Sequence, residues 1–567
     1  MHDLVIDNAR IVDGTGAPAR HGSIAVSGGR IVEVGGGAGQ AARERLDAGG
    51  LALAPGFIDP HTHYDAQLAW DPLVTSSSWH GVTTVVTGNC GVGVAPCRPD
   101  AREILMNDLV NVEAIPLDVM RRAIAWRWES FPQWMDALAA APLGINVAPL
   151  VPLTPLRHYV MGEASFDRAA SADEVTRMAG LLDEAVGAGA FGFSTTVLAN
   201  HVGHQGRPLA CRMASGDELG ALARVLRRRG RGAIEIALTA QADRVSDEEL
   251  TTLTLLVEES RRPVTFLALF ARPGRPPGSF EEGLSRVAPL LGRDRAVPQV
   301  SCRPLRIQFT LKNPFIWATI AAWAPAFNRP VDEQMALYRG AAFRSEWKAE
   351  MDRRRMGRAL WPRITIRDAG TPAIAALAGQ SIADIAATRG VDPPDALLDL
   401  ALEDGLETLF DFPVFNQDPE AVRPLVTDPR FLIGLSDGGA HVDQLCDAGY
   451  ATYLLGKWVR QWQALRLEEG VRRLTSEVAD FFGIPHRGRL VPGAVADLVL
   501  FDPATVDDEA PEYVHDLPGG AKRLVARARG VHATVVSGAV VYRDGKDTGA
   551  RAGTVLRAGT VLRSGTV

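Results

Sequence analysis

The sequence predicts an α/β fold, a TIM-like (β/α)8 barrel with a small β-sandwich domain formed by both chain ends. Apolar strands alternate with helical stretches through the middle of the chain, which indicates parallel βα units. Eight such strands can be counted, the number that forms a barrel. The alternative is an open doubly wound sheet. The barrel is favoured because no Gly-rich phosphate-binding motif follows the first strand.

The small domain is expected from residues 1–53 and 485–545, at opposite ends of the chain. LVIDNARIVDG and GSIAVSGGRIVEVG near the N-terminus, and VHATVVSGAVVYRDG near the C-terminus, have period-2 patterns between turns. Such patterns indicate hairpins. The barrel is expected over residues 54–484, and residues 546–567 are expected to be a frayed tail without chemistry.

The barrel strands can be placed from their apolar runs. They are expected at 54–63, 82–90, 145–152, 190–196, 233–239, 263–269, 297–302 and 431–437. An insertion at about 310–430 separates the last two and is either a lid or a peripheral scaffold. Its Phe315, Trp317 and Trp323 either line an apolar pocket or form the core of the insertion.

Composition limits the classes of partner. The 567 residues carry a net charge of −7, and a nucleic-acid binder needs a basic face instead. No apolar run reaches the roughly 18–20 residues that cross a bilayer. Five scattered cysteines are typical of reduced thiols, and no secretory signal is evident, so we expect a cytoplasmic protein. We also expect a homo-oligomer, with no nucleic acid and no membrane as partners.

The stretch FIDPHTHYDAQ carries the first candidate metal ligands, His61 and His63. Residues two apart at the end of a strand point to the same side, which in a barrel is the mouth where active sites form. Imidazole is a common zinc ligand. The alternative is a chance pair of loop histidines.

Two further strand ends carry suitable groups. Asp437, in LIGLSDGGAHV, could hold a metal and take a proton from water, or could be a turn aspartate. His441 follows it as a substrate contact or a polar loop residue. Cys90, in VTGNCGVGVAPC, could supply a thiolate to zinc or could be a small core residue.

These motifs together resemble the amidohydrolase superfamily, and within it the N-acyl-D-amino-acid deacylases (D-aminoacylases). The similarity is carried by LVIDNARIVDGTG, APGFIDPHTHYD, TGNCGVGVAP, LRHYVMG, SDGGAH and GRLVPGAVADLVLFDP. It implies a TIM-like barrel with a small β-sandwich, and hydrolysis of an amide by metal-activated water. It also implies zinc held by His61, His63, Cys90 and Asp437, with Asp437 as the general base.

The sequence departs from the family pattern at two strand ends. Members place histidines at the ends of the fifth and sixth strands, where this chain reads AIEIALTAQ and VTFLALFAR. We therefore expect one zinc ion per chain instead of two. His201 or His204 could substitute as a ligand, or the metal could be lost and the pocket reused.

The expected function is that of a metal-dependent hydrolase of a small N-acylated amino acid or related amide. A substrate carboxylate would need a bidentate arginine, for which Arg157 and Arg303 are candidates. His201 and His441 are further candidate substrate contacts. One alternative is a hydrolase of a cyclic amide or ester. The other is a non-catalytic ligand-binding barrel that lost part of its metal site.

Overall fold

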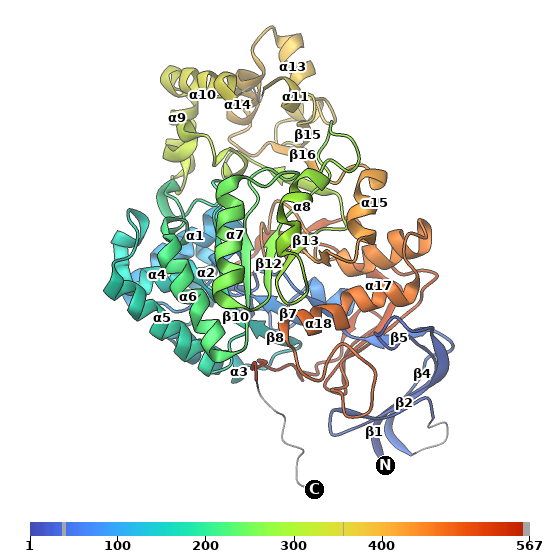
Figure 1. Cartoon of the computed structure of the whole chain (residues 1–567). Coiled ribbons are helices and arrows are strands. Elements are labelled where there is room, and N and C mark those ends of the chain that lie inside the picture. Colours follow the sequence, from blue (N-terminus) through green and yellow to red (C-terminus); the bar gives the residue numbers. More distant parts are fainter. Residues whose placement is uncertain (37–40, 355–356, 560–567) are drawn as a thin grey trace.

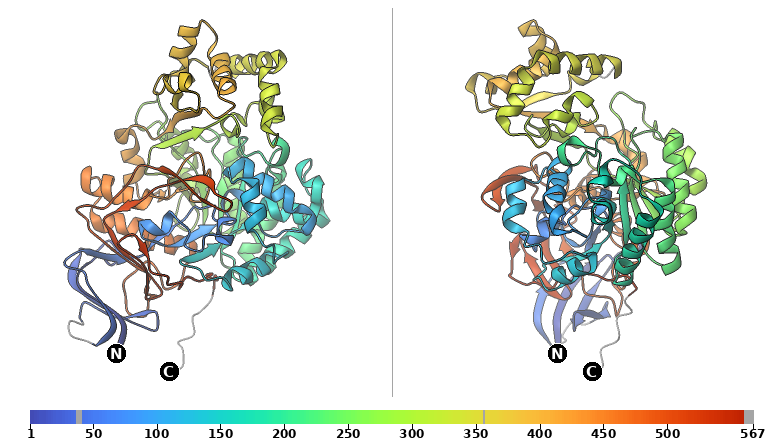
Figure 2. Two further views of the ribbon diagram at one scale, coloured as in Figure 1. Left: turned by 180° about the vertical axis from the view of Figure 1, so that it is seen from behind. Right: turned by 90° about the vertical axis from the view of Figure 1, so that its left-hand side faces the viewer.

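The computed structural model describes residues 1–36, 41–354 and 357–559. Three parts can be followed in Figure 1: a sheet that contains the N-terminus, a central set of parallel strands with outer helices, and an insertion beyond them. The insertion and the N-terminal sheet lie at opposite ends of the molecule in every view (Figures 1 and 2). None of the described helices is both long and apolar enough to cross a membrane.

Both chain ends contribute to one mixed sheet of nine strands. Most neighbouring strands are antiparallel, and β1 pairs in parallel with β4 and β5. Strand β5 pairs with β18, so that Leu53 faces Leu500 and the two ends of the chain are joined. Leu4, Ile24 and Val535 belong to its own apolar cluster. The strands are β1 (His2–Ile11), β2 (Arg20–Ser27), β3 (Arg30–Val34), β4 (Ala42–Asp47), β5 (Ala52–Pro55), β18 (Leu498–Phe501), β23 (Val531–Val536), β24 (Ala539–Arg543) and β25 (Lys546–Asp547). Two short hairpin-like pairs, β19 (Asp507–Asp508) with β22 (Ala528–Arg529) and β20 (Glu512–Leu517) with β21 (Ala521–Val525), complete this half.

The central strands are parallel and have the TIM-like order. They are β6 (Phe57–Asp59), β7 (Val82–Thr87), β8 (Asn146–Pro149), β9 (Val151–Pro152), β10 (Gly192–Thr196), β11 (Ala233–Ala237), β12 (Val264–Leu267), β13 (Ala296–Val300) and β17 (Leu432–Ile433). Nearly all their residues are buried, as expected for strands covered on both faces. Each of the eight sequence-predicted segments overlaps a central strand, and the segment 145–152 covers both β8 and β9.

The hydrogen bonding between the central strands is interrupted, so that they form two separate sheets. One has the order β6-β7-β8 and the other the order β9-β10-β11-β12-β13-β17. Only Leu150 separates β8 from β9, so a single run of chain leads from one sheet to the other. Between β17 and β6 the link is a bridge of Thr62 to Gly438, just beyond both strands. The described residues thus form a barrel-like ring of strands without one continuous closed ladder.

Three of the helices on the outside of the strands begin at serine caps. Ser171, Ser215 and Ser246 each accept a hydrogen bond from the backbone of the third helical residue, which satisfies an exposed N–H. These three residues start α5 (Ala172–Gly187), α6 (Gly216–Arg229) and α7 (Asp247–Ser260). The other helices of this part are α1 (Arg102–Glu113), α2 (Leu117–Ala123), α3 (Phe131–Ala139), α4 (Leu153–Met161), α8 (Glu281–Val287), α15 (Pro419–Thr427), α16 (Tyr450–Tyr453), α17 (Leu467–Leu474) and α18 (Ser476–Phe482).

The insertion has its own sheet and its own core. It contains β14 (Leu305–Phe309), α9 (Val331–Arg339), α10 (Ala341–Arg354), α11 (Gly357–Leu360), β15 (Thr365–Asp368), α12 (Pro372–Ala375), α13 (Ile382–Arg389), α14 (Pro393–Glu403) and β16 (Leu409–Phe415). Its sheet has the order β14-β16-β15. The buried rings of Trp317 and Trp323 stack 5.8 Å apart inside it, so these two tryptophans are core of the insertion. Helix α15, within the expected insertion, packs instead on the barrel core.

The described part of the tail is docked on the barrel. The backbone N–H of Val147, in β8, donates to Thr554 O (2.9 Å), and Val147 O accepts from Leu556 N (2.8 Å). Leu556 is buried. The expectation of a frayed tail is therefore wrong as far as Gly559, because these hydrogen bonds give the segment a strand partner. Residues 560–567 lie outside the described residues.

Candidate metal centre

Four side chains predicted as metal ligands meet at the ends of three central strands. The ligand atoms of His61, His63 and Cys90 lie within 4.8 Å of one another, and all three residues are buried. Asp437 Oδ1 lies 3.4 Å from Nε2 of His61 and 3.9 Å from Nε2 of His63. Cys90 Sγ lies 3.5 Å from Nε2 of His61. Both imidazoles therefore turn Nε2 toward the common centre.

The backbone on either side of the two histidines is held at several points. Asp59 accepts a hydrogen bond from the His61 N–H (3.2 Å), and the Ser436 hydroxyl donates to His61 O (3.2 Å). The His63 N–H donates to Gly438 O (2.7 Å). Because Ser436 and Gly438 flank Asp437, these bonds fix the distance between the histidines and the aspartate.

A tight turn brings Cys90 to the same centre. Gly88 and Gly91 on either side have φ of +81° and +71°, and Cys90 itself has φ of +53°. A Cβ on Gly91 would lie 3.0 Å from the Cα of Thr195, so the turn needs glycine for space as well as for conformation. The strained backbone at Cys90 is an outlier of the kind that clusters at functional sites.

Burial keeps the candidate nitrogen ligands uncharged. It lowers the pKa of His61 to about 3, against a smaller opposing effect of Gln299. It lowers the pKa of His63 as well, and the neighbouring histidines 61, 441 and 201 add to this. Neutral imidazole is the form that binds a metal. Burial and the charge of Glu235 raise the pKa of the Cys90 thiol, an effect that a bound cation would reverse.

Three carboxylates, Glu113, Glu235 and Asp437, gather around the same centre, and within the described residues none of them pairs with a lysine or an arginine. Glu113 and Glu235 are buried, and burial raises the pKa of both. Burial also raises the pKa of Asp437 to about 7, with a contribution from Asp447, although 27% of the Asp437 side chain remains exposed. Buried carboxylates are costly unless a cation compensates them. The donors and the surrounding charge thus fit a divalent metal ion.

Two further histidines border this centre. His201 and His441 are in electrostatic contact with His63, and burial lowers their pKa values to about 3 and about 4. The ring of Phe315, from the insertion, lies 4.8 Å from that of His441. His204 instead interacts with Asp108. Of the two proposed substitutes for a missing ligand, His201 is the one beside the candidate ligands.

Both arginines predicted to bind a substrate carboxylate form ion pairs inside the protein. Arg157 pairs with Glu218, and both side chains are fully buried. Arg303 pairs with Asp447 (3.1 Å) and with Asp508. Neither guanidinium is free to receive a substrate, since each already neutralises carboxylates of the chain.

Arg212 was not predicted from the sequence and is better placed. It donates to the carbonyl oxygens of Ala199 (3.2 Å) and His201 (3.1 Å), next to one of the bordering histidines. Desolvation lowers its pKa. In the parts of the chain that the structure describes, no carboxylate pairs with it. The local sequence around Arg212 contains no motif that indicates a substrate contact. Only the fold brings Arg212 beside His201.

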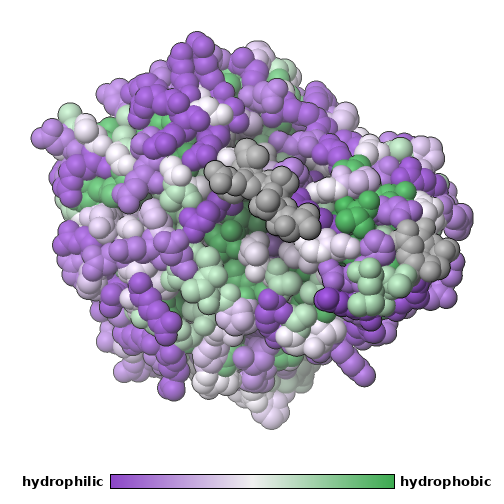
Figure 3. Space-filling model, turned by 90° about the horizontal axis from the view of Figure 1, so that it is seen from below, coloured by the Kyte–Doolittle hydropathy of each residue, from purple (hydrophilic) through white to green (hydrophobic). Residues whose placement is uncertain are grey.

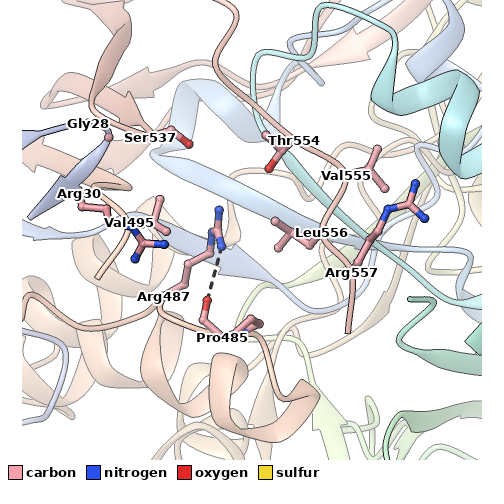
Figure 4. Close-up of a pocket in the computed structure, with 11 residues that line it drawn as sticks. Gly28, Arg30, Pro485, Arg487, Val495, Ser537, Thr554, Val555, Leu556 and Arg557 are labelled. Atoms are coloured by element: carbon pink, nitrogen blue, oxygen red, sulfur yellow. Dashed lines mark hydrogen bonds between the residues drawn. The ribbon is translucent and has the colours of Figure 1, made fainter. Parts of the chain in front are cut away.

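A narrow cavity reaches Asp437 from outside, lined also by Tyr64, Gln67, Gly438, Cys446 and Arg523. Another cavity, of about 370 Å³, lies between the small sheet and the docked tail. Arg30, Arg487 and Arg557 surround it, with Arg487 bonded to Pro485 O (Figure 4). None of the candidate ligands lines it. From below, the molecule is largely hydrophilic, with apolar surface gathered near the middle of this face (Figure 3).

Comparisons with known proteins agree on one family. The model of the amidohydrolase family matches residues 44–288 and 366–542. The chain is 32% identical to an N-acyl-D-aspartate deacylase of Alcaligenes xylosoxydans xylosoxydans, over 98% of this chain and 95% of that protein. Two solved structures, each 27% identical, cover 98% of this chain and are themselves covered completely.

The first of these structures is a D-aminoacylase with a TM-score of 0.69. Its metal centre is binuclear, with activation by one metal and attenuation by the second. The other is an N-acyl-D-glutamate deacylase of Bordetella bronchiseptica, with a TM-score of 0.68, in complex with zinc and a phosphonate that mimics the tetrahedral intermediate.

Proposed function

The chain belongs to the amidohydrolase family, and from this premise we propose that it is a metal-dependent hydrolase of N-acyl-D-amino acids. The reaction cleaves the C–N bond of the amide and releases a carboxylic acid and a D-amino acid. The proposal rests mainly on one observation: His61, His63 and Cys90 are buried with their ligand atoms close together, and Asp437 lies beside them. The similarity to deacylases over nearly the whole chain supports the substrate class.

The donor set fits a zinc-type ion, since neutral imidazoles and a thiolate are preferred zinc ligands. When bound, such an ion supplies a Lewis acid for the substrate carbonyl and lowers the pKa of a water molecule toward neutrality. His61, His63 and Cys90 would hold it, with Asp437 as a further ligand. We propose one ion per chain, because β11 and β12 end at Ala237 and Leu267 without a histidine. One-metal activation of the similar D-aminoacylase is consistent with this number.

Asp437 acts as the general base. Its side chain is 27% exposed and lines a cavity of about 20 Å³, enough for a water molecule, and its oxygen faces both candidate imidazoles. It takes the proton from the attacking water and passes it to the leaving nitrogen. The Gly438 and Ser436 contacts to the histidine segment keep the base in line with the ligands.

The substrate carboxylate is held by Arg212. A guanidinium that lies beside His201 and has no carboxylate partner among the described residues can give two parallel hydrogen bonds to that group. His201, whose carbonyl orients Arg212, and His441, against Phe315, border the substrate from the other loops. The acyl group then points toward the insertion, from which Phe315 comes.

The test combines metal analysis with a substrate screen. The purified chain should contain about one equivalent of zinc or a similar ion, and should release acetate from N-acetyl-D-aspartate, N-acetyl-D-glutamate or N-acetyl-D-leucine. The L-enantiomers serve as matched controls and should react far more slowly. A protein that binds no divalent ion, or one that binds it but hydrolyses none of the D-substrates, would contradict the proposal.

A further inference from the structure

Each of the two candidate histidine ligands has a buried carboxylate behind it. Glu113 Oε1 lies 3.1 Å from Nδ1 of His63. Glu235 Oε1 lies 3.9 Å from Nδ1 of His61. Both carboxylates are on the side of the ring opposite to Nε2, which faces Asp437. The two pairs come from different elements, since Glu113 ends α1 and Glu235 lies in the middle of β11.

The atoms that face each other in these pairs make no hydrogen bond of ordinary geometry within the described structure. His61 Nδ1, His63 Nδ1, Glu113 Oε1 and Glu235 Oε1 are all buried and lack a hydrogen-bond partner among the described residues. Glu113 is 1% exposed and Glu235 is fully buried. A buried carboxylate without a hydrogen-bond partner lowers the stability of the fold by several kcal/mol. The burial of these two glutamates therefore needs another explanation.

The chemistry of an imidazole ligand supplies that explanation. A histidine that binds a metal through Nε2 must carry its proton on Nδ1, and an acceptor at Nδ1 fixes this tautomer and the orientation of the ring. A carboxylate acceptor also makes Nε2 a better donor to the metal. Glu113 Oε1 lies within hydrogen-bond distance of Nδ1 of His63, and Glu235 Oε1 lies on the same side of the His61 ring at the longer distance of 3.9 Å.

Glu235 has a second contact that links it to the third ligand. Its Oε2 accepts a hydrogen bond from the backbone N–H of Cys90 (2.6 Å), in the strained turn after β7. One carboxylate thus touches the ring of His61 and the backbone of Cys90. Glu235 lies on β11, the strand whose end lacks the expected histidine, so this strand contributes to the centre from behind the ligands.

We propose that Glu113 and Glu235 are positioning residues, which hold His63 and His61 with Nε2 turned toward the metal, and that Glu235 also fixes the Cys90 turn. The inference rests on the proposed metal-dependent function. It assigns neither glutamate as a ligand, because each lies on the Nδ1 side of its histidine.

The experiment measures the metal-free protein first. With histidine labelled by nitrogen-15, the wild-type chain without zinc should show His61 and His63 as Nδ1–H tautomers. Glu235→Leu should change the signal of His61 and leave that of His63, and Glu113→Leu should do the reverse. Unchanged signals in both variants would overturn the inference, and this result does not depend on whether the enzyme is active.

Zinc affinity and cobalt spectra then separate a positioning role from direct ligation. Glu113→Leu and Glu235→Leu should weaken zinc binding roughly 10–100-fold, and the Gln variants, which keep an acceptor oxygen, should recover part of it. The cobalt-loaded variants should keep the wild-type coordination spectrum. A changed coordination number in Glu235→Gln would make Glu235 a ligand and overturn the proposal.

Glu218→Gln is the matched control, because Glu218 is a fully buried barrel carboxylate that pairs with Arg157 instead of a histidine. It should lower the melting temperature and leave zinc affinity within twofold of wild type. If the variants at Glu113, Glu235 and Glu218 all lost the same amount of zinc affinity, the loss would be a general effect of removing buried charge, and the inference would be overturned. Absence of zinc binding in the wild type would contradict the proposed function alone, since the tautomer measurement still decides the roles of the two glutamates.

Discussion

Asp437 Oδ1 lies 3.4 Å from Nε2 of His61, although the two residues follow the last and the first of the central strands. The backbone bonds between the two segments hold this distance, so the carboxylate and the imidazole form one unit. The Asp437 carboxylate therefore faces the side of both imidazoles on which a metal ion would be held.

Replacing Asp437 by Asn should remove the base and keep the shape of the side chain. We expect kcat to fall by at least about 10²–10⁴-fold, the usual contribution of a general base, while His61, His63 and Cys90 still retain zinc. Steady-state kinetics with N-acetyl-D-aspartate and zinc analysis of the same sample check this. An active Asp437→Asn enzyme would exclude Asp437 as the base.

His63→Ala should remove a ligand, and so should abolish turnover through loss of zinc. Zinc content and activity should fall together, and an excess of zinc in the assay should restore part of the activity. His532→Ala is the control, because the His532 side chain is partly exposed and pairs with Asp544, away from the candidate ligands. Full zinc content in His63→Ala without activity would mean that His63 acts on the substrate instead.

Removing the metal should abolish activity and destabilise the fold. A ligand that binds only the native state adds about 2.7 kcal/mol when present at about 100 times its Kd, so zinc should raise the melting temperature of the chelator-treated protein. Calorimetry with and without zinc measures this. A melting temperature that does not respond to zinc would argue against a site built from His61, His63 and Cys90.

Arg212→Met should weaken substrate binding more than it slows the chemical step. Loss of a charge-assisted bidentate contact costs about 1.5–3 kcal/mol, which corresponds to a rise in KM of roughly 10–100-fold. Arg212→Lys should recover little of this, because an ammonium group lacks the planar fork. Unchanged KM values in both variants would place the substrate carboxylate elsewhere.

Arg157→Met should act on stability instead. Removal of one partner from a buried ion pair costs about 3–5 kcal/mol because the other charge stays buried, so the melting temperature should fall. The double variant with Glu218→Leu should regain most of the loss. If Arg157→Met raised KM at a temperature where the protein is folded, the sequence-based expectation of a substrate contact would return.

The sequence was sufficient for the order of the strands and for the residues at their ends. Apolar runs and the HxH motif located β6, and the SDGG motif located the segment after β17, because local patterns carry this information. It did not reveal the roles proposed for Glu113, Glu235 and Arg212. A glutamate in the apolar run AIEIA has no pattern of its own, and its meaning depends on Cys90 and His61, which only the folded ring of strands brings to it.

Arginine partners and the tail were hard to predict for related reasons. Local sequence offers Arg157 and Arg303 as candidate substrate contacts but does not show that carboxylates from distant segments, Glu218 and Asp508, pair with them. The short repeat at the C-terminus looked structureless because its partner, β8, lies far away in the sequence. Long-range pairing of this kind cannot be read from local composition.

The docking of Thr554 and Leu556 on Val147 has a consequence for how the protein is made. The backbone N–H and C=O of Val147, in the first third of the chain, pair with residues that are translated about 400 residues later. Until Thr554 and Leu556 have been translated, this edge of β8 lacks their hydrogen bonds and is open to association with other nascent chains. A stop codon before Gly553 would make this state permanent and favour aggregation, while leaving every residue of the metal centre in the translated chain.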